Sequence, residues 1–194
     1  MGNKNYRAFT VSWNGQTNVL SSDIGVSIPF NPDSYQLEPD ILSYKAIWDT
    51  GATCSVITKD VAKKLGLEPV SKTIVRGVGG EKIENVYLVN FYLPNKVMIP
   101  FVRITECDEL GGNEFGVLIG MDIISIGDFA VTNVNGKTTM SYRYPSIKTI
   151  DYVKEAERDN AEKGKKASLL KKKELNKKRK RERQNKKKNR KMKR

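Results

Sequence analysis

One aspartate stands out in this sequence because of the residues on either side of it. The segment from Ala46 to Ile57 reads Ala-Ile-Trp-Asp-Thr-Gly-Ala-Thr-Cys-Ser-Val-Ile, so an apolar strand delivers Asp49 to a turn and a second apolar run leaves that turn. A carboxylate placed between two buried strands serves either acid-base chemistry or a fixed set of hydrogen bonds. The Asp-Thr-Gly triplet alone does not decide, since Asp also accepts backbone N–H groups in ordinary turns.

The composition excludes several other catalytic mechanisms. The 194 residues include no His, which excludes Ser-His-Asp and Cys-His triads and every zinc site with a His ligand. The two cysteines, Cys54 and Cys107, are too few for a four-cysteine metal cluster and lack the dense spacing of a disulfide scaffold, so we expect reduced thiols. We therefore expect neither a metal nor a cofactor, and the carboxylates become the leading candidates for chemistry.

The residues near Asp49 and the second cysteine have simpler interpretations. Cys54 has no His or basic neighbour to activate it, so we expect a small buried thiol rather than a nucleophile. Cys107 lies between Glu106 and Asp108, whose negative charges should raise the pKa of its thiol. We expect Trp48 to pack in the core.

Two further segments follow the aspartate. Arg76-Gly77-Val78-Gly79-Gly80-Glu81 lies between two strand-like runs, and its glycines suit a hairpin tip that opens and closes, although a plain flexible turn would use them too. It matches neither common phosphate-binding pattern, and no helix pattern follows it. Val117-Leu118-Ile119-Gly120-Met121-Asp122 places apolar residues and a Gly before a short helical turn.

In this order, the three segments resemble the retropepsin-like aspartic proteases, the family of retroviral proteases and their cellular and bacterial relatives, over residues 44–142. The resemblance implies a mainly β, closed-barrel acid protease fold with one or two short helices. It implies that Asp49 is the catalytic acid/base, that Thr50 braces the two active-site loops and that Gly51 contacts substrate. It further implies substrate contacts and a flap at Ala52, Arg76, Gly77, Val78, Gly79 and Gly80, and support of the catalytic loop by Leu118, Ile119 and Gly120. Where some viral members carry an Arg, this chain has Met121-Asp122.

Aspartic proteolysis needs two carboxylates at close range that share one proton. One acts as a base on water while the other, protonated, polarises the scissile carbonyl. This chain has a single Asp-Thr-Gly, and its nearest rival, Asp23-Ile24-Gly25, lacks the hydroxyl residue and the preceding apolar run. We therefore expect a homodimer with one Asp49 from each copy, acting on extended polypeptide segments with apolar side chains near the scissile bond. The alternative is a non-catalytic dimeric β-module that binds nucleic acid or another polyanion.

The elements that position these residues are mainly short strands rich in β-branched and aromatic residues. A helix should begin after Thr58 and stop at Gly66, and a second should follow Gly120. Asn135-Gly136 predicts a type I′ hairpin turn. The predicted strands are 6–13, 24–30, 44–48, 73–78, 83–93, 97–104, 115–119, 129–134 and 138–142.

The positive charge is confined to the end of the chain. Residues 1–150 hold 14 basic and 15 acidic side chains, whereas residues 151–194 hold 21 and 7. We predict a protease domain at 1–146 and a basic tail at 147–194, disordered or helical. We expect the tail to contact nucleic acid or a ribosome-like surface without sequence selectivity, since it has almost no aromatic residues for base stacking. The residues expected to bind the polyanion are Lys171, Lys172, Lys173, Lys177, Lys178, Arg179, Lys180, Arg181, Arg183, Lys186, Lys187 and Lys188.

The sequence also bears on location. It begins with Met1-Gly2-Asn3-Lys4-Asn5-Tyr6 rather than with a secretory signal, and it contains no 18-residue apolar run. We expect a cytoplasmic protein without a transmembrane segment.

Overall fold

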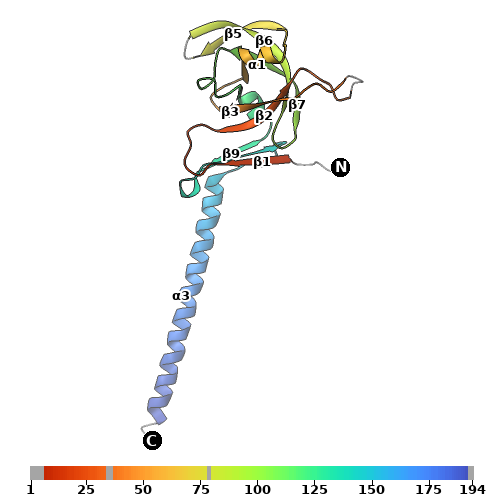
Figure 1. Ribbon diagram of the computed structural model, residues 1–194. Coiled ribbons are helices and arrows are strands. Elements are labelled where there is room, and N and C mark those ends of the chain that lie inside the picture. The colour runs from red at the N-terminus through yellow and green to blue at the C-terminus, as the bar shows by residue number, and fades with distance from the viewer. Residues whose placement is uncertain (1–6, 34–36, 78–79, 192–194) are drawn as a thin grey trace. The chain divides into compact units, whose positions relative to one another are not determined.

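The structure, a computed structural model, describes residues 7–33, 37–77 and 80–191, with the side chains of residues 183–191 outside the description. It divides into two compact units, Met1–Lys148 and Thr149–Arg194. The first unit is mainly β and carries short helices (Figure 1).

The strands of the first unit form two sheets. A three-stranded sheet has the order β1-β10-β9, and a seven-stranded sheet has the order β2-β3-β8-β4-β7-β6-β5. β2 also pairs with β6, so the pairings of the larger sheet return to their first strand. The strands are β1 (Arg7–Ser12), β2 (Ser21–Ser27), β3 (Leu42–Trp48), β4 (Val56–Thr58), β5 (Ser71–Gly77), β6 (Gly80–Tyr92), β7 (Met98–Cys107), β8 (Val117–Ile119), β9 (Asp128–Thr132) and β10 (Thr139–Tyr144).

Strand β8 lies between the strand that enters the Asp49 turn and the strand that leaves it. It pairs in parallel with β3, where Trp48 is opposite Ile119, and antiparallel with β4, where Val56 is opposite Leu118. Parallel neighbours need long connections, so β8 arrives here from far along the chain. This insertion places the Asp49 turn directly over the end of β8.

The short helices begin and end where the sequence indicates. Helix α1 (Lys59–Lys64) starts after Thr58, whose side chain accepts the Val61 N–H, and Gly66 follows it with a φ of 62°. Helix α2 (Met121–Ile124) starts after Gly120. Both predicted helices are confirmed, and each buries an apolar face against the sheet.

An aromatic cluster fills the core next to the Asp49 turn. Trp48 is 3% exposed, stacks on Phe129 at 5.8 Å between ring centroids, and lies 5.1 Å from the ring of Tyr142. Its indole N–H donates to the Ser22 hydroxyl at 2.9 Å. The prediction that Trp48 belongs to the core is confirmed, and its packing fixes the end of the strand that delivers Asp49.

The predicted strand segments correspond to strands with their ends shifted by a few residues, with two departures. Strand β4 was not predicted, because three residues between a turn and a helix carry too little pattern. Asn135 and Gly136 have positive φ as expected and connect β9 to β10, but Thr139 pairs with Thr132, so the loop is longer than the predicted two-residue turn.

The second unit contains a single long element, α3 (Tyr152–Lys191), drawn in blue in Figure 1. Of the two states expected for the basic segment, disordered or helical, the structure has the helix, consistent with the high helix propensity of its Lys, Arg, Glu, Ala and Leu residues. In the described part of the chain, no helix combines the length and apolar character needed to cross a membrane.

Asp128, at the start of β9, ties the three-stranded sheet to the segment that follows it. Its carboxylate accepts hydrogen bonds from the Ser146 hydroxyl at 2.6 Å, from the Arg143 guanidinium and from the Ile147 N–H at 3.1 Å. These donors, the Ser146 hydroxyl foremost and then Arg143, lower the pKa of Asp128 below its ordinary value.

We expect Asp128→Asn to lower the free energy of unfolding at pH 7 by about 1–3 kcal/mol, since hydrogen bonds to a charged acceptor are lost. A pKa lowered by folding gives a contribution to stability that is fully present above the unfolded value of about 4 and is lost progressively as pH falls from there toward the lowered folded value. Urea unfolding at pH 7 and pH 2 should therefore show a clearly larger difference between wild type and variant at pH 7 than at pH 2. An equal difference at both pH values, or an equal effect of Asp60→Asn in α1, would contradict this account.

Candidate active site

Asp49 follows β3 directly and starts a tight turn. Its backbone N–H donates to the Ile119 carbonyl at 2.9 Å, and its Oδ1 accepts the Gly51 N–H at 2.8 Å. The Ala52 N–H closes the turn on the Asp49 carbonyl at 3.3 Å. The side chain is half-buried, and Oδ2 has no hydrogen bond within the described residues. One oxygen is thus fixed in place while the other is available to water or a ligand.

The two residues after Asp49 differ in what they contact. A Cβ on Gly51 would lie 3.1 Å from Asp49 Oδ1, so a side chain there would press on the carboxylate. Thr50 is exposed, and across residues 7–33, 37–77 and 80–191 of the same protomer its hydroxyl finds no hydrogen-bond partner. The bracing contact implied for Thr50 is therefore not made within the part of one protomer that the structure describes.

The segment after β8 supports the Asp49 turn from behind. The Met121 N–H donates to the Ala52 carbonyl at 2.8 Å, and the Asp122 N–H donates to the Thr53 carbonyl at 3.2 Å. Leu118 and Ile119 lie in β8, next to β3 and β4. The chain therefore brings together the Asp49 turn and the apolar-apolar-Gly segment, which are about 70 residues apart.

Sequence reasoning missed a polar pair under this turn, formed by the buried Ser55 and the half-buried Asp122. Ser55 is fully buried, and its hydroxyl donates to Asp122 Oδ1 at 2.7 Å while accepting the Gly120 N–H at 3.0 Å. The Ser55 N–H also donates to Asp122 Oδ2 at 3.0 Å. The only available signal was a polar residue at position 55, directly before an apolar strand.

Gly120 lies where the two segments approach most closely. A Cβ there would come within 2.6 Å of the Cys54 carbonyl carbon and 2.7 Å of its oxygen, and these backbone atoms cannot swing aside. We expect Gly120→Ala to lower the free energy of unfolding by about 1–3 kcal/mol or more, because the loop must shift. Gly15→Ala is the matched control, since its Cβ would meet nothing within 4 Å. Equal stability of both variants in denaturant unfolding would show that the contact is not rigid.

The residues on either side of the Gly-rich segment pair as the two strands of a hairpin. In β5 and β6, Arg76 is opposite Glu81 and Gly77 is opposite Gly80. The Arg76 and Glu81 side chains form an exposed ion pair at 2.6 Å, and Gly80 has a φ of 100°. Val78 and Gly79, predicted at the flap tip, lie outside the described residues.

The expectation for Cys54 is wrong, whereas that for Cys107 is supported. Cys54 is exposed, because it occupies the outer side of the turn while the next residue, Ser55, faces inward. Burial, followed by the nearby charges of Asp108 and Glu84, raises the pKa of the Cys107 thiol to about 11. The pKa of Cys107 is thus raised as expected, although burial contributes more than the charges.

The residues predicted to bind a polyanion lie on α3. The side chains described there are exposed, whereas those of Arg183, Lys186, Lys187 and Lys188 lie outside the description. The exposed ones are Lys171, Lys172, Lys173, Lys177, Lys178, Arg179, Lys180 and Arg181.

A half-exposed aspartate on a turn that is braced from behind can exchange a proton with a bound ligand or water. Among the described residues, no group of three or more His, Cys, Asp or Glu side chains is placed to hold a metal ion. The sequence of residues 40–123 matches the aspartyl protease family. This segment contains the Asp49 turn, the hairpin and the supporting segment, and the predicted resemblance to retropepsin-like aspartic proteases is confirmed. A sequence comparison with curated proteins gives no match.

Several solved structures are similar in fold. A retropepsin-like aspartic protease from Rickettsia conorii is 12% identical, with 74% of this chain and 98% of that chain covered and a TM-score of 0.42. The EIAV protease in complex with the inhibitor HBY-793 is 19% identical, with coverages of 59% and 92% and a TM-score of 0.42. The retroviral protease-like domain of Ddi1 from Leishmania major is 18% identical, with coverages of 59% and 82% and a TM-score of 0.36.

Proposed function

We propose that this chain is an aspartic endopeptidase that hydrolyses peptide bonds as a homodimer. The family match over residues 40–123 supports a protease. The observation that carries the proposal is the state of the Asp49 carboxylate, which has one oxygen held by the Gly51 N–H and the other unpaired among the described residues.

The chemistry follows from the charge of two such groups. Two carboxylates a few ångströms apart cannot both ionise, so the pair retains one proton. The ionised member takes a proton from water as the water attacks the peptide carbonyl, and the protonated member donates a hydrogen bond to the carbonyl oxygen. Because the two members are identical, neither Asp49 has a fixed role. We expect a mildly acidic optimum, because one carboxyl group must remain protonated.

The second carboxylate comes from a second copy of the chain. Asp23, the rival acid, lies within β2 opposite Lys45 rather than on a turn. The exposed Thr50 hydroxyl finds no partner among the described residues of its own protomer. A dimer would supply one if the equivalent loop of another copy lay across a two-fold axis. The peptide would contact Ala52 in the Asp49 turn and the tip of the β5–β6 hairpin. The hairpin residues concerned are Arg76, Gly77, Val78, Gly79 and Gly80.

The test is an assay on the purified full chain with a library of denatured peptides across pH 4–8. We expect cleavage whose specific rate rises with protein concentration, as dimer formation requires, and loss of cleavage in Asp49→Ala. Indistinguishable cleavage by wild type and Asp49→Ala would overturn the proposal.

A second activity is favoured by α3. From position 163 to 194 the chain has 19 basic and 2 acidic residues, and within the described part of that stretch no basic side chain forms an ion pair. We propose that this segment binds nucleic acid through phosphate contacts, without reading the bases. If the protease assay fails, this binding module becomes the preferred function.

A further inference from the structure

A cavity of about 200 Å³ lies between the flap hairpin, which is formed by β5 and β6, and the end of β7. It is smaller than the roughly 300–1,000 Å³ typical of pockets for drug-sized ligands, so its size suits one side chain. The end of β7 is linked to the Asp49 turn through β4, where Thr58 pairs with Cys107. The lining residues are Val75, Gly80, Lys82, Glu84, Glu106, Cys107 and Asp108.

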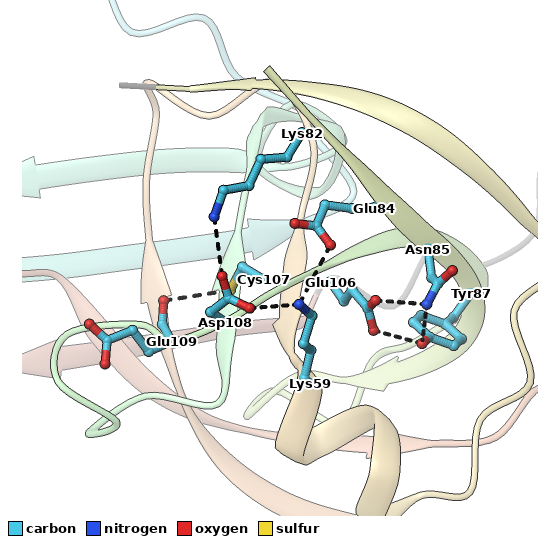
Figure 2. Close-up of polar contacts among 9 residues, drawn as sticks. All are labelled: Lys59, Lys82, Glu84, Asn85, Tyr87, Glu106, Cys107, Asp108 and Glu109. Carbon is cyan, nitrogen blue, oxygen red and sulfur yellow. Dashed lines mark hydrogen bonds and ion pairs between the residues drawn. The ribbon is translucent and has the colours of Figure 1, made fainter. Parts of the chain in front are cut away.

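One of the three lining carboxylates is neutralised within the protein. Asp108 accepts Lys59 Nζ at 2.6 Å and Lys82 Nζ at 3.2 Å, as Figure 2 shows. These two hydrogen bonds lower the pKa of Asp108. Both ammonium groups at this site therefore direct their short hydrogen bonds to a single carboxylate, Asp108.

The second carboxylate, Glu106, is buried and forms no ion pair with a cation of the described residues. It is 7% exposed, and its oxygens accept the Asn85 amide at 2.7 Å and the Tyr87 hydroxyl at 2.7 Å (Figure 2). Both donors are neutral, so they hold the carboxylate in place while leaving its charge uncompensated at close range.

The third carboxylate, Glu84, is the one best placed to meet a ligand. Its side chain is 11% exposed, and the nearest cation, Lys59 Nζ, lies at 3.9 Å while bonding Asp108 at 2.6 Å. The shared Lys59 therefore leaves Glu84 without a short charged hydrogen bond among the described residues. Among the described residues, the cavity is lined by three carboxylates and reached by two ammonium groups, those of Lys82 in its lining and Lys59 beside it, so one positive charge is lacking.

We propose that this cavity receives a basic side chain of the peptide substrate, Arg in preference to Lys, with Glu84 as its counter-ion. This inference rests on the proposed peptidase function. No group of acidic, Cys or His side chains among the described residues is arranged for a metal ion, which favours an elongated organic cation. A guanidinium can bond one carboxylate through two parallel hydrogen bonds, and its aliphatic stem can lie against Val75.

The test uses fluorescein-labelled decapeptides of one apolar parent sequence, with Arg, norleucine or Glu placed at each position in turn. Cleavage is measured as kcat/KM with the full wild-type chain, and binding by fluorescence anisotropy with Asp49→Asn. At one position of the peptide, kcat/KM and affinity should be about tenfold higher with Arg than with norleucine, the effect expected of a charged hydrogen bond. Glu84→Gln should remove the preference for Arg, and Glu84→Lys should replace it with a preference for Glu. Glu114 is an exposed carboxylate paired with Lys45, so the control variant Glu114→Gln should keep the preference for Arg.

The outcomes separate this inference from the proposed function. If Asp49→Asn cleaves like wild type, the peptidase proposal fails, while the anisotropy data still decide whether the cavity selects Arg. If cleavage depends on Asp49 but no position favours Arg, or the preference survives in a folded Glu84→Gln variant, the inference is wrong and the peptidase proposal stands.

Discussion

Replacing Asp49 by Asn is expected to lower kcat/KM by about 10²–10⁴-fold or more, the range typical of losing a general acid or base. The amide keeps the shape of the side chain and can still accept the Gly51 N–H through its oxygen. It cannot take a proton from water, so the turn should stay folded while the chemistry stops. Initial rates with a peptide substrate of the wild type and the variant, at equal concentrations, measure the loss.

The matched control is Asp23→Asn, which removes the other Asp-x-Gly acid from the exposed face of β2. We expect its kcat/KM to stay within about twofold of wild type, as for a surface substitution away from the chemistry. A loss in Asp23→Asn equal to that in Asp49→Asn, with both variants folded, would mean that the catalytic acid has been assigned wrongly.

Removing eight positive charges from α3 should produce the next largest effect. Exchanging them for Gln keeps the helix propensity while removing the phosphate contacts. If six to ten such contacts form, wild-type binding to DNA should weaken by about 10³–10⁵-fold between 50 and 200 mM salt. The variant should bind DNA far more weakly than the wild type at 50 mM salt, and its affinity should change much less as the salt concentration rises. The residues exchanged are Lys171, Lys172, Lys173, Lys177, Lys178, Arg179, Lys180 and Arg181.

Fluorescence anisotropy with two DNA duplexes of unrelated sequence measures both affinity and sequence selectivity. We expect equal affinities for the two duplexes, because phosphate contacts carry no sequence information. A control variant with Gln at Lys63 and Lys64, on α1, should bind like wild type. Salt-independent binding, or binding that survives the eight substitutions, would contradict a role for α3.

Much of the fold and the position of the candidate site followed from the sequence. The helix that begins after Thr58 and ends before Gly66 could be predicted because a hydroxyl cap and a left-handed glycine depend only on neighbouring residues. Asp49 and Gly120 could be placed together only through the resemblance to a known family. The contact between their segments is long-range, and no local pattern encodes it.

The features that escaped prediction depend on the packing of distant segments. Ser55 and Asp122 meet because β8 enters between β3 and β4, which neither local sequence indicates. The exposure of Cys54 depends on which way the turn faces. The cavity next to Glu84 needs the flap hairpin, the end of β7 and Lys59 in one place.

The most direct measurement is the separation of the two Asp49 carboxylates in a crystal structure of the protein bound to an uncleavable peptide mimic. We predict a two-fold dimer in which an oxygen of one Asp49 lies within about 2.5–3.0 Å of an oxygen of its twin, as a shared proton requires. A monomer with the mimic bound, or a dimer whose Asp49 turns lie far apart, would contradict the account.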